Sequence, residues 1–390
     1  MARPLLVALD GDGLVHRAFH GMSRGGGDLD LDADGRPVWA LRGLVTAVAA
    51  ACGRLRPHAV LVAFDGHQDC VRRAAHPHYK AHRPPREPTL DDQVISAPQL
   101  LRQAGIPSAQ VPGWEGDDVL ASAARLAREQ QWDCVLVTSD RDSFALLDQT
   151  TSVLRVREGG IEGSALLTPA LLSASYGVRP DQYRDYAVLR GDSSDNLPGA
   201  PGVGPTLAAR LLAEFGSLAD LLEALDGGAV ARVAAVTGAT VAERLADPVV
   251  RADLLRTVEI MTMRTDLALP DPESLRLPLD RPRLVAALRS RQIMLGPSLW
   301  SLVGGEPPAW APSGFDSVPS QLPAPAPAPI WRARTVPPMV DLIAAHDRQS
   351  AGSAAAAGGA ALVEAARLAV RSGRRGGRVV EVAEDQLELF

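Results

Sequence analysis

The stretch Gly113-Trp114-Glu115-Gly116-Asp117-Asp118-Val119-Leu120-Ala121 combines three carboxylates with the start of an apolar run that extends to Ala124. Its two glycines permit close backbone approach, and the apolar run predicts a buried helix that begins near Glu115. On such a helix Glu115 and Asp118 share one face, where like charges repel unless a cation or a proton neutralises them. No Lys or Arg lies between Pro112 and Ala124 to do so. An acidic helix N-terminus, stabilised by the helix dipole, is the alternative interpretation.

Three short apolar runs end in aspartates and predict buried parallel strands. They are Leu5–Leu9 before Asp10, Val60–Phe64 before Asp65, and Cys134–Thr138 before Asp140 and Asp142. An Ala- and Val-rich helix is expected over 38–52, so strands and helices alternate. This alternation predicts an α/β fold with a mostly parallel sheet. Because ligands bind beyond the carboxyl ends of such strands, the four aspartates and the helix from Glu115 are expected to meet at one edge. A single aspartate at such a position would be an ordinary turn residue.

The segment from His67 to Arg86 is basic and contains four histidines, with Asp69 as its single acid. Its other basic residues are Arg72, Arg73, Lys80, Arg83 and Arg86. Lys80 is the single lysine among 40 Lys and Arg residues, which suits a requirement for a compact point charge. Prolines interrupt regular helix in this segment. A basic, irregular segment beside an acidic site predicts a lid or arch that grips phosphate, with a solvated basic loop as the alternative.

A second acidic stretch follows residues 165–190, which are expected to be helical. The turn Gly191–Asn196 adds Asp192 and Asp195, and the glycine-rich stretch 199–206 then opens a helix from Leu207 to Phe215. A glycine hairpin between helices exposes backbone N–H groups that attract phosphate. This stretch therefore predicts contact with a DNA backbone, with an ordinary helix turn as the alternative. Helical patterns continue from 225 to about 304.

Composition narrows the class of protein. A net charge of −6 over 390 residues argues against a generally basic nucleic-acid coat but permits a local basic patch. Three cysteines without CxxC spacing predict a reducing cytosol and neither zinc nor disulfides. No apolar run approaches the ~20 residues of a membrane-spanning helix, and the N-terminus lacks a signal-peptide pattern. We therefore expect a soluble, cytoplasmic protein.

The composition changes beyond Gly305. Pro-Ala alternation, an Ala/Gly tract and Gly-Arg repeats predict a low-complexity linker over 305–385. Residues 386–390 then place three large apolar side chains after a polar stretch, and such anchors predict a receiving pocket on a partner. A chance apolar ending, or one that folds back on the rest of the chain, is the alternative.

Taken together, these stretches resemble the flap endonuclease and 5′-3′ exonuclease family, most closely the 5′-nuclease domain of bacterial DNA polymerase I in a standalone form. The resemblance runs from about residue 5 to 300. The motifs that carry it are Leu9-Asp10-Gly11, Phe64-Asp65-Gly66, Tyr79-Lys80-Ala81-His82-Arg83-Pro84-Pro85, Gly113 to Asp118, Thr138 to Asp142, and Gly191-Asp192-Ser193-Ser194-Asp195-Asn196. Departures are His67 in place of a common lysine, Gly116 in place of a frequent alanine, and Ser139-Asp140-Arg141 in place of a Gly- or Ala-Asp-Lys run.

The resemblance implies an architecture. Residues 1–175 would form a PIN-like catalytic domain with a central sheet and a helical arch at about 67–90. Residues 176–304 would form a second subdomain with a helix-hairpin-helix DNA-binding module. A linker over 305–385 and a sliding-clamp-binding peptide, Gln386, Leu387, Leu389 and Phe390, would complete the chain.

The resemblance also implies roles for individual residues. The family's metal-binding acids fall on Asp10, Asp65, Glu115, Asp117, Asp118, Asp140, Asp142, Asp192 and Asp195. Arg72, Lys80 and Arg83 match arch residues that handle the scissile phosphate. DNA contacts fall on Tyr79, Arg73, Gly199, Gly202, Val203, Gly204 and Thr206.

The implied activity is that of a structure-specific 5′-3′ exonuclease or flap endonuclease in DNA replication and repair. Two Mg²⁺ ions, with Mn²⁺ as a substitute, would act about 4 Å apart on an in-line phosphodiester displacement. A potassium ion at the hairpin is also implied. The expected partners are DNA with 5′ flaps, nicks or RNA-primed 5′ ends and the bacterial sliding clamp, bound by a monomer beside the nucleoid. A PIN-type ribonuclease and a non-catalytic DNA-structure-binding protein are the rival interpretations.

Overall fold

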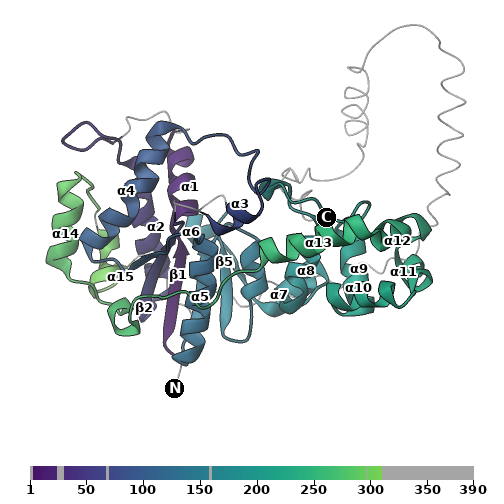
Figure 1. Cartoon of the computed structure of the whole chain (residues 1–390). Helices are drawn as coiled ribbons and strands as arrows, with labels where there is room; N and C mark the ends of the chain where they lie inside the picture. The colour runs from purple at the N-terminus through teal and green to yellow at the C-terminus, as the bar shows by residue number, and fades with distance from the viewer. Residues whose placement is uncertain (1–2, 24–29, 67–69, 158–159, 296, 310–390) are drawn as a thin grey trace, which may run out of the picture. The chain divides into compact units, whose positions relative to one another are not determined.

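The computed structural model describes residues 3–23, 30–66, 70–157, 160–295 and 297–309. Its sheet has six strands in the order β3-β2-β1-β4-β5-β6 (Figure 1). The strands are β1 (Leu5–Asp10), β2 (Ala59–Phe64), β3 (Ser108–Gln110), β4 (Asp133–Thr138), β5 (Thr151–Arg155) and β6 (Leu166–Leu167). The first five are parallel to their neighbours, and β6 is antiparallel to β5. The predicted α/β class and the three predicted strands are confirmed, and β1 lies between the other two.

Helices cover both faces of the sheet. The helices α1 (Gly11–Ser23), α2 (Trp39–Leu55) and α4 (Pro88–Ala104) pack on the face that receives Leu5, Val7 and Leu9 of β1. The opposite face receives Leu6 and Ala8, which pack with residues of α5 (Gly116–Glu129). Successive side chains of a strand point to opposite faces, so a continuous apolar run is buried on both sides.

Short elements connect the layers. The basic segment after β2 contains α3 (Val71–Ala75) and then runs irregularly to α4, as its prolines predict. The loop after β4 contains the 3₁₀ helix η1 (Asp142–Leu146), and α6 (Gly160–Gly163) follows β5.

A helical region follows the sheet. It contains α7 (Pro169–Tyr176), α8 (Pro180–Arg190), the 3₁₀ helix η2 (Ser193–Asp195), α9 (Pro205–Phe215), α10 (Leu218–Asp226), α11 (Val230–Thr237), α12 (Ala239–Ala246) and α13 (Pro248–Met261). The stretch predicted as helical over 165–190 is thus two helices preceded by the short strand β6.

The chain then returns to the sheet, which the sequence did not indicate. The returning elements are η3 (Pro272–Leu275), α14 (Arg281–Ser290), η4 (Pro297–Leu299) and α15 (Trp300–Val303). Leu284, Leu288 and Leu302 are buried in the same core as α2 and α4. The Ser301 hydroxyl donates to the carbonyl of Ala49 at 2.8 Å. The last part of the range 176–304, which contains α14 and α15, therefore packs against the helices that cover the sheet. No helix in the described ranges is long and apolar enough to cross a membrane.

Candidate active site

Asp10 ends β1 and is held from two sides. Its carboxylate accepts hydrogen bonds from the Gly13 N–H at 2.8 Å and from the Thr138 hydroxyl at 2.9 Å. A side chain at Gly13 would collide with this carboxylate and force it to move, so glycine at this position preserves the place of Asp10. Burial raises the pKa of Asp10 to about 6, and the neighbouring Asp65 and Asp140 carboxylates add to the rise.

The loop after β4 brings Asp140 and Asp142 to the same edge. Asp140 donates its N–H to the Thr138 hydroxyl at 3.0 Å and accepts from the Asp142 N–H at 2.9 Å. Burial raises the pKa of Asp142 well above its ordinary value, and Asp140, Asp192 and Asp195 raise it further. The Asp142 Oδ1 atom is buried and has no hydrogen-bond partner among the described residues.

The first turn of α5 adds Asp117, and the end of β2 adds Asp65. Burial raises the pKa of Asp117 well above its ordinary value, and Asp140, Asp10 and Asp142 contribute in the same direction. The Asp65 carboxylate accepts from the Gly116 N–H at 2.7 Å, which ties β2 to the start of α5.

These carboxylates form what we call the open group, which consists of Asp10, Asp65, Asp117, Asp140 and Asp142. Among the described residues, no Lys or Arg side chain forms an ion pair with any of them. The sequence predicts that the strand-end aspartates and the first turn of α5 meet at one edge of the sheet. In agreement, the Asp140 charge raises the pKa of Asp10, Asp117 and Asp142.

Asp118 has a different environment, dominated by Arg72. It is 0% exposed, and its two oxygens accept from the Arg72 guanidinium at 2.6 and 2.7 Å. The same carboxylate accepts from the backbone N–H groups of Glu115 at 3.0 Å and Arg264 at 2.7 Å. Arg72 also donates to the carbonyls of Ile260 and Thr262. This pair joins α3, α5 and the end of α13.

Glu115 receives three donors from the basic segment. Its Oε1 atom accepts from the Lys80 ammonium at 2.6 Å. Its Oε2 atom accepts from the Tyr79 hydroxyl at 3.0 Å and from Arg72 at 3.1 Å. Burial and the Glu115 charge raise the pKa of Tyr79, so its hydroxyl keeps the proton it donates. Burial opposes the charge of Lys80, but Glu115 and Asp195 raise its pKa above the ordinary value and keep it cationic.

Asp195 is the third paired carboxylate. It lies 2.5 Å from the Arg83 guanidinium and 3.7 Å from the Lys80 ammonium. Burial raises the pKa of Asp195, while Lys80 and Arg83 oppose that rise. We call Glu115, Asp118 and Asp195, with Arg72, Lys80 and Arg83, the paired group. Asp192 lies in the same turn as Asp195 and accepts from the Ser194 N–H and hydroxyl.

Three of the expected roles stay predictions, because in this structure the side chains concerned are bonded within the protein. Arg72 and Asp118, predicted to handle the scissile phosphate and to bind metal, are bonded to each other. Tyr79, predicted to contact DNA, is 5% exposed and bonded to Glu115. The acidic stretch 115–118 has no Lys or Arg within it. Arg72 and Lys80, which lie far from it in sequence, supply its positive charges.

Sequence reasoning missed residues that hold the site together. The Asp12 carboxylate accepts from the Asp65 N–H at 2.7 Å, and Thr138 bonds both Asp10 and Asp140. Asn196 donates its side-chain amide to the carbonyl of His78 at 2.8 Å. The signal for Asp12 was its place two residues after Asp10 in Asp10-Gly11-Asp12-Gly13. His67, named as a departure from the family pattern, lies outside the described residues, as does the peptide 386–390.

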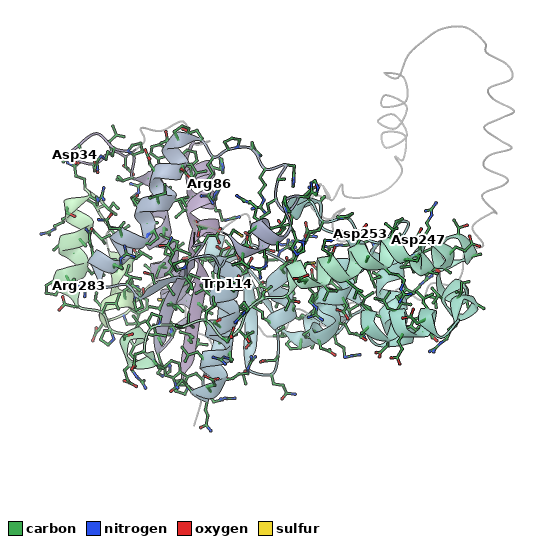
Figure 2. The ribbon with its side chains drawn as sticks, in the orientation of Figure 1. Asp34, Arg86, Trp114, Asp247, Asp253 and Arg283 are labelled. Carbon is green, nitrogen blue, oxygen red and sulfur yellow. The ribbon has the colours of Figure 1, made fainter. Side chains whose placement is uncertain are left out.

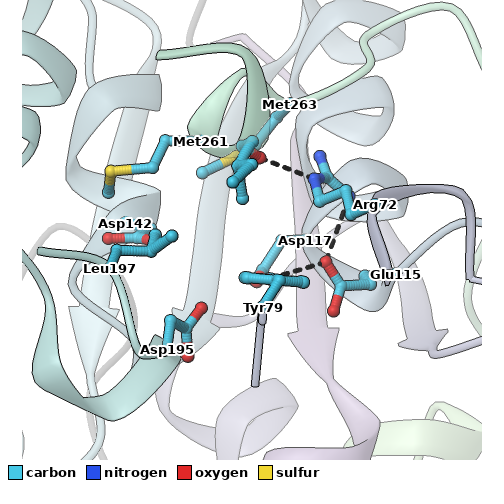
Figure 3. A pocket seen from close by; sticks show the side chains of 10 residues that line it. Arg72, Tyr79, Glu115, Asp117, Asp142, Asp195, Leu197, Met261 and Met263 are labelled. Atoms are coloured by element: carbon cyan, nitrogen blue, oxygen red, sulfur yellow. Dashed lines mark hydrogen bonds and ion pairs between the residues drawn. The ribbon is translucent and has the colours of Figure 1, made fainter. Parts of the chain in front are cut away.

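A small pocket is lined by residues of both groups. Figure 3 shows Glu115, Asp117, Asp142 and Asp195 around it, with Tyr79 between them. Its volume is about 10 Å³, which is about the space that one water requires. The remaining lining residues are Arg72, Leu197, Ile260, Met261 and Met263.

The donor set suits a hard cation. Carboxylate oxygens are the ligands that Mg²⁺ and Mn²⁺ prefer, and the buried, unbonded Asp142 oxygen fits such an ion. Within the described ranges, no group of three or more Asp, Glu, His or Cys side chains is arranged to hold a metal ion by itself. An ion held by the open group would therefore keep several waters, as Mg²⁺ commonly does.

The predicted hairpin lies between the acidic turn and α9. Gly202 has a φ of +87°, and the chain closes with a bond from the Val203 N–H to the Ala200 carbonyl at 2.9 Å. Val203 is buried, whereas Gly202, Gly204 and Thr206 are exposed. Exposed backbone groups and the side chains of Pro205 and Thr206 are thus presented at the start of α9. Arg73 is exposed on α3.

Two family models match consecutive parts of the chain. The model of the 5′-3′ exonuclease N-terminal resolvase-like domain matches residues 5–177, which hold the sheet and the open group. The model of the 5′-3′ exonuclease C-terminal SAM fold matches residues 178–281, which hold the acidic turn and the hairpin. This chain belongs to the 5′-3′ exonuclease family.

Relatives of this 5′-3′ exonuclease family member are longer proteins. The thermostable DNA polymerase I of Thermus aquaticus is 34% identical over 316 residues, which make up 80% of this chain and 36% of that protein. DNA polymerase I of Mycobacterium tuberculosis (strain H37Rv) is 33% identical over 282 residues, 72% of this chain and 30% of that one. The chain therefore matches only about a third of the length of these relatives.

Solved structures with a similar course of the chain are distant in sequence. The T5 D15 protein co-crystallised with metal ions is 18% identical, with a TM-score of 0.47 over 66% of this chain and 100% of that one. The catalytic core of Rad2 in complex with DNA substrate is 16% identical, with a TM-score of 0.49 over 77% of this chain and 90% of that one.

Proposed function

We propose that this 5′-3′ exonuclease family member is a structure-specific 5′ nuclease. It would hydrolyse phosphodiester bonds near the 5′ ends of flapped, nicked or RNA-primed DNA. The observation that carries the proposal is the open group, in which Asp140 is exposed and the other four carboxylates are partly buried. None of the five forms an ion pair with a described Lys or Arg, although the Lys80 charge acts on Asp117 and Asp142.

The open group would hold two divalent cations, with Mg²⁺ as the natural ion and Mn²⁺ as a substitute. Asp10, Asp117, Asp140 and Asp142 are the first candidates to hold them, because burial and the neighbouring Asp140 charge raise the pKa of Asp10, Asp117 and Asp142. Among the described residues, none of the four forms an ion pair with Lys or Arg. When bound, such ions activate a water molecule and neutralise the charge that develops on the phosphate.

The chain's own residues would orient the substrate. Lys80 and Arg83 lie on the basic segment, bonded to Glu115 and Asp195 in this structure, and their charges would face a phosphate bound at the open group. Phosphate oxygens of the substrate would therefore replace these carboxylates as partners of Lys80 and Arg83. The products would carry a 5′-phosphate.

The duplex beside the cleavage point would lie on the hairpin. The exposed backbone of Gly202 and Gly204 and the start of α9, an 11-residue helix, offer N–H donors to phosphate oxygens. A potassium ion at this hairpin would add positive charge at the same place. Arg73 would contact the strand that approaches the basic segment.

A cleavage assay tests this proposal. The full chain is incubated with a labelled 5′-flap duplex, a nicked duplex and single-stranded RNA, each with Mg²⁺ and with EDTA. We expect Mg²⁺-dependent cleavage of both DNA substrates and little cleavage of the RNA. Preferential cleavage of the RNA would indicate a ribonuclease, and DNA binding without any cleavage would indicate a structure-binding protein.

We also propose that residues 386–390 bind the bacterial sliding clamp. Leu387, Leu389 and Phe390 are apolar anchors after a polar stretch, and Glu388 separates two of them. Flexible chain of roughly 80 residues has a root-mean-square span of about 50 Å, so a tether of that length would leave the nuclease free to turn. Deleting 386–390 should abolish binding to purified clamp by calorimetry and leave cleavage of short linear substrates unchanged. A truncated chain that binds the clamp equally well would refute this proposal.

A further inference from the structure

The basic segment is tied to the acidic turn by its backbone as well as by its charges. The Lys80 N–H donates to the carbonyl of Asp195 at 3.0 Å. The Arg83 guanidinium donates to the carbonyl of Ser194 at 3.3 Å and to the Asp195 carboxylate at 2.5 Å. Residues 78–83 and the turn 192–197 therefore form one hydrogen-bonded unit.

Within this unit Lys80 adopts a costly backbone conformation. Its φ is +55°, in the left-handed region that residues other than glycine rarely occupy. Such a conformation persists only where surrounding contacts hold it, and it is often found at functional sites. The Lys80 ammonium lies 2.6 Å from Glu115, and its charge acts on Asp117 and Asp142 of the open group.

Asn196 is the one side chain of the turn that is bonded to the backbone just before Lys80. Its amide nitrogen donates to the carbonyl of His78 at 2.8 Å. Because a carbonyl only accepts, the orientation of the Asn196 amide follows from its partner. Asn196 has a φ of +60°, a conformation that asparagine tolerates better than most residues. The amide is exposed at the surface, so it does not act by filling the core.

The turn that carries Asn196 is itself firmly held. Asp192 and Leu197 exchange N–H to carbonyl bonds at 2.9 and 2.8 Å. A side chain at Gly191 would meet the Gly199 nitrogen, so the turn lies directly against the first residue of the hairpin. The Asn196 amide therefore links the DNA-binding hairpin to the segment that carries Lys80.

We propose that Asn196 is a positioning residue for Lys80: its amide holds the His78 carbonyl and so keeps the Lys80 ammonium over the carboxylates. The inference rests on the proposed nuclease function. Asn196 itself does not touch the reacting atoms.

Single-turnover cleavage of a 5′ flap tests this role with variants that separate backbone from side chain. Asn196→Gly removes the amide but retains easy access to positive φ. It should cleave about tenfold more slowly, since one hydrogen bond typically shifts a population by a few-fold to about tenfold. Flap affinity, measured in Ca²⁺, should change less than about twofold. Ser193→Ala, an exposed neighbour without a side-chain hydrogen bond among the described residues, is the matched control and should cleave at the wild-type rate.

A double-mutant cycle distinguishes positioning from general structural support. On a Lys80→Ala background, Asn196→Gly should slow cleavage no further, because no ammonium is left to position. An equal loss on both backgrounds, or a wild-type rate for Asn196→Gly alone, would overturn the inference. If the wild-type chain itself fails to cleave, the proposed function is wrong instead.

Discussion

Two sets of carboxylates lie at one edge of the sheet, and they differ in what neutralises them. The paired group has cations supplied by the basic segment, with Asp118 and Arg72 bonded at 2.6 and 2.7 Å inside the protein. The open group has backbone and hydroxyl donors but no paired Lys or Arg among the described residues. A buried charge requires a partner, so loss of either member of the Arg72–Asp118 pair should destabilise the fold. We propose that this pair is structural and that the open group binds cations.

The largest expected effect is on catalysis by the open group. Asp117→Asn and Asp140→Asn should each slow Mg²⁺-dependent flap cleavage by roughly a thousandfold or more, because each removes a charge that would hold the ion. The same variants should unfold in metal-free urea at a denaturant concentration no lower than wild type, since they relieve repulsion. Flap binding in EDTA should persist. Retained Mg²⁺-dependent cleavage in both variants would show that the site is misplaced.

A variant of the paired group should lose stability, whereas the variants of the open group should retain it. Asp118→Asn removes the bidentate carboxylate partner of the buried Arg72 guanidinium and leaves it only the Glu115 carboxylate, at 3.1 Å. The free energy of unfolding in metal-free buffer should therefore fall by about 3 kcal/mol. Urea titration followed by circular dichroism measures this loss. Asp266→Asn is the matched control, because the Arg264–Asp266 pair lies at the surface and should contribute little. An Asp118→Asn chain as stable as wild type would remove the distinction between the groups.

Lys80 belongs to the paired group, but its charge also acts on Asp117 and Asp142 of the open group. Lys80→Ala should slow single-turnover cleavage about a hundredfold and change flap affinity much less, because its charge is needed most in the transition state. Lys80→Arg should recover part of the rate, since a planar guanidinium does not replace a compact ammonium. A wild-type rate for Lys80→Ala would show that the single lysine has no catalytic role.

The smallest expected effect comes from Tyr79. Tyr79→Phe keeps the buried ring but removes the hydrogen bond to Glu115, so the free energy of unfolding should fall by about 1 kcal/mol. Affinity for flap DNA should stay unchanged in a fluorescence-anisotropy titration. A clear loss of affinity would restore the DNA-contacting role that the family resemblance implied for this residue.

Sequence alone located most of the open group. Asp10, Asp65 and Asp140 follow apolar runs, and parallel strands bring their carboxyl ends to one edge whatever the details of packing. The same reasoning could not distinguish Asp117 from Asp118, which are adjacent in sequence. One full helical step of about 100° separates their side chains, and this rotation places Asp118 against Arg72, 46 residues away.

Sequence patterns also could not predict contacts between residues far apart in the chain. The Asn196 bond to His78 spans 118 residues and involves a backbone carbonyl, for which no residue type is diagnostic. The return of α14 and α15 to the sheet depends on Leu284, Leu288 and Leu302, whose helical spacing would suit either part of the chain. Periodicity identifies a buried face but does not say which surface covers it.

Calorimetric titration with Mn²⁺ in the absence of DNA tests the central claim most directly. The wild-type chain and the Asp117→Asn and Asp118→Asn variants are compared at a temperature where all three are folded by circular dichroism. The distinction between the groups predicts that Asp117→Asn abolishes or strongly weakens Mn²⁺ binding, while Asp118→Asn binds with near wild-type affinity. Mn²⁺ binding that survives in Asp117→Asn and disappears in Asp118→Asn would contradict it.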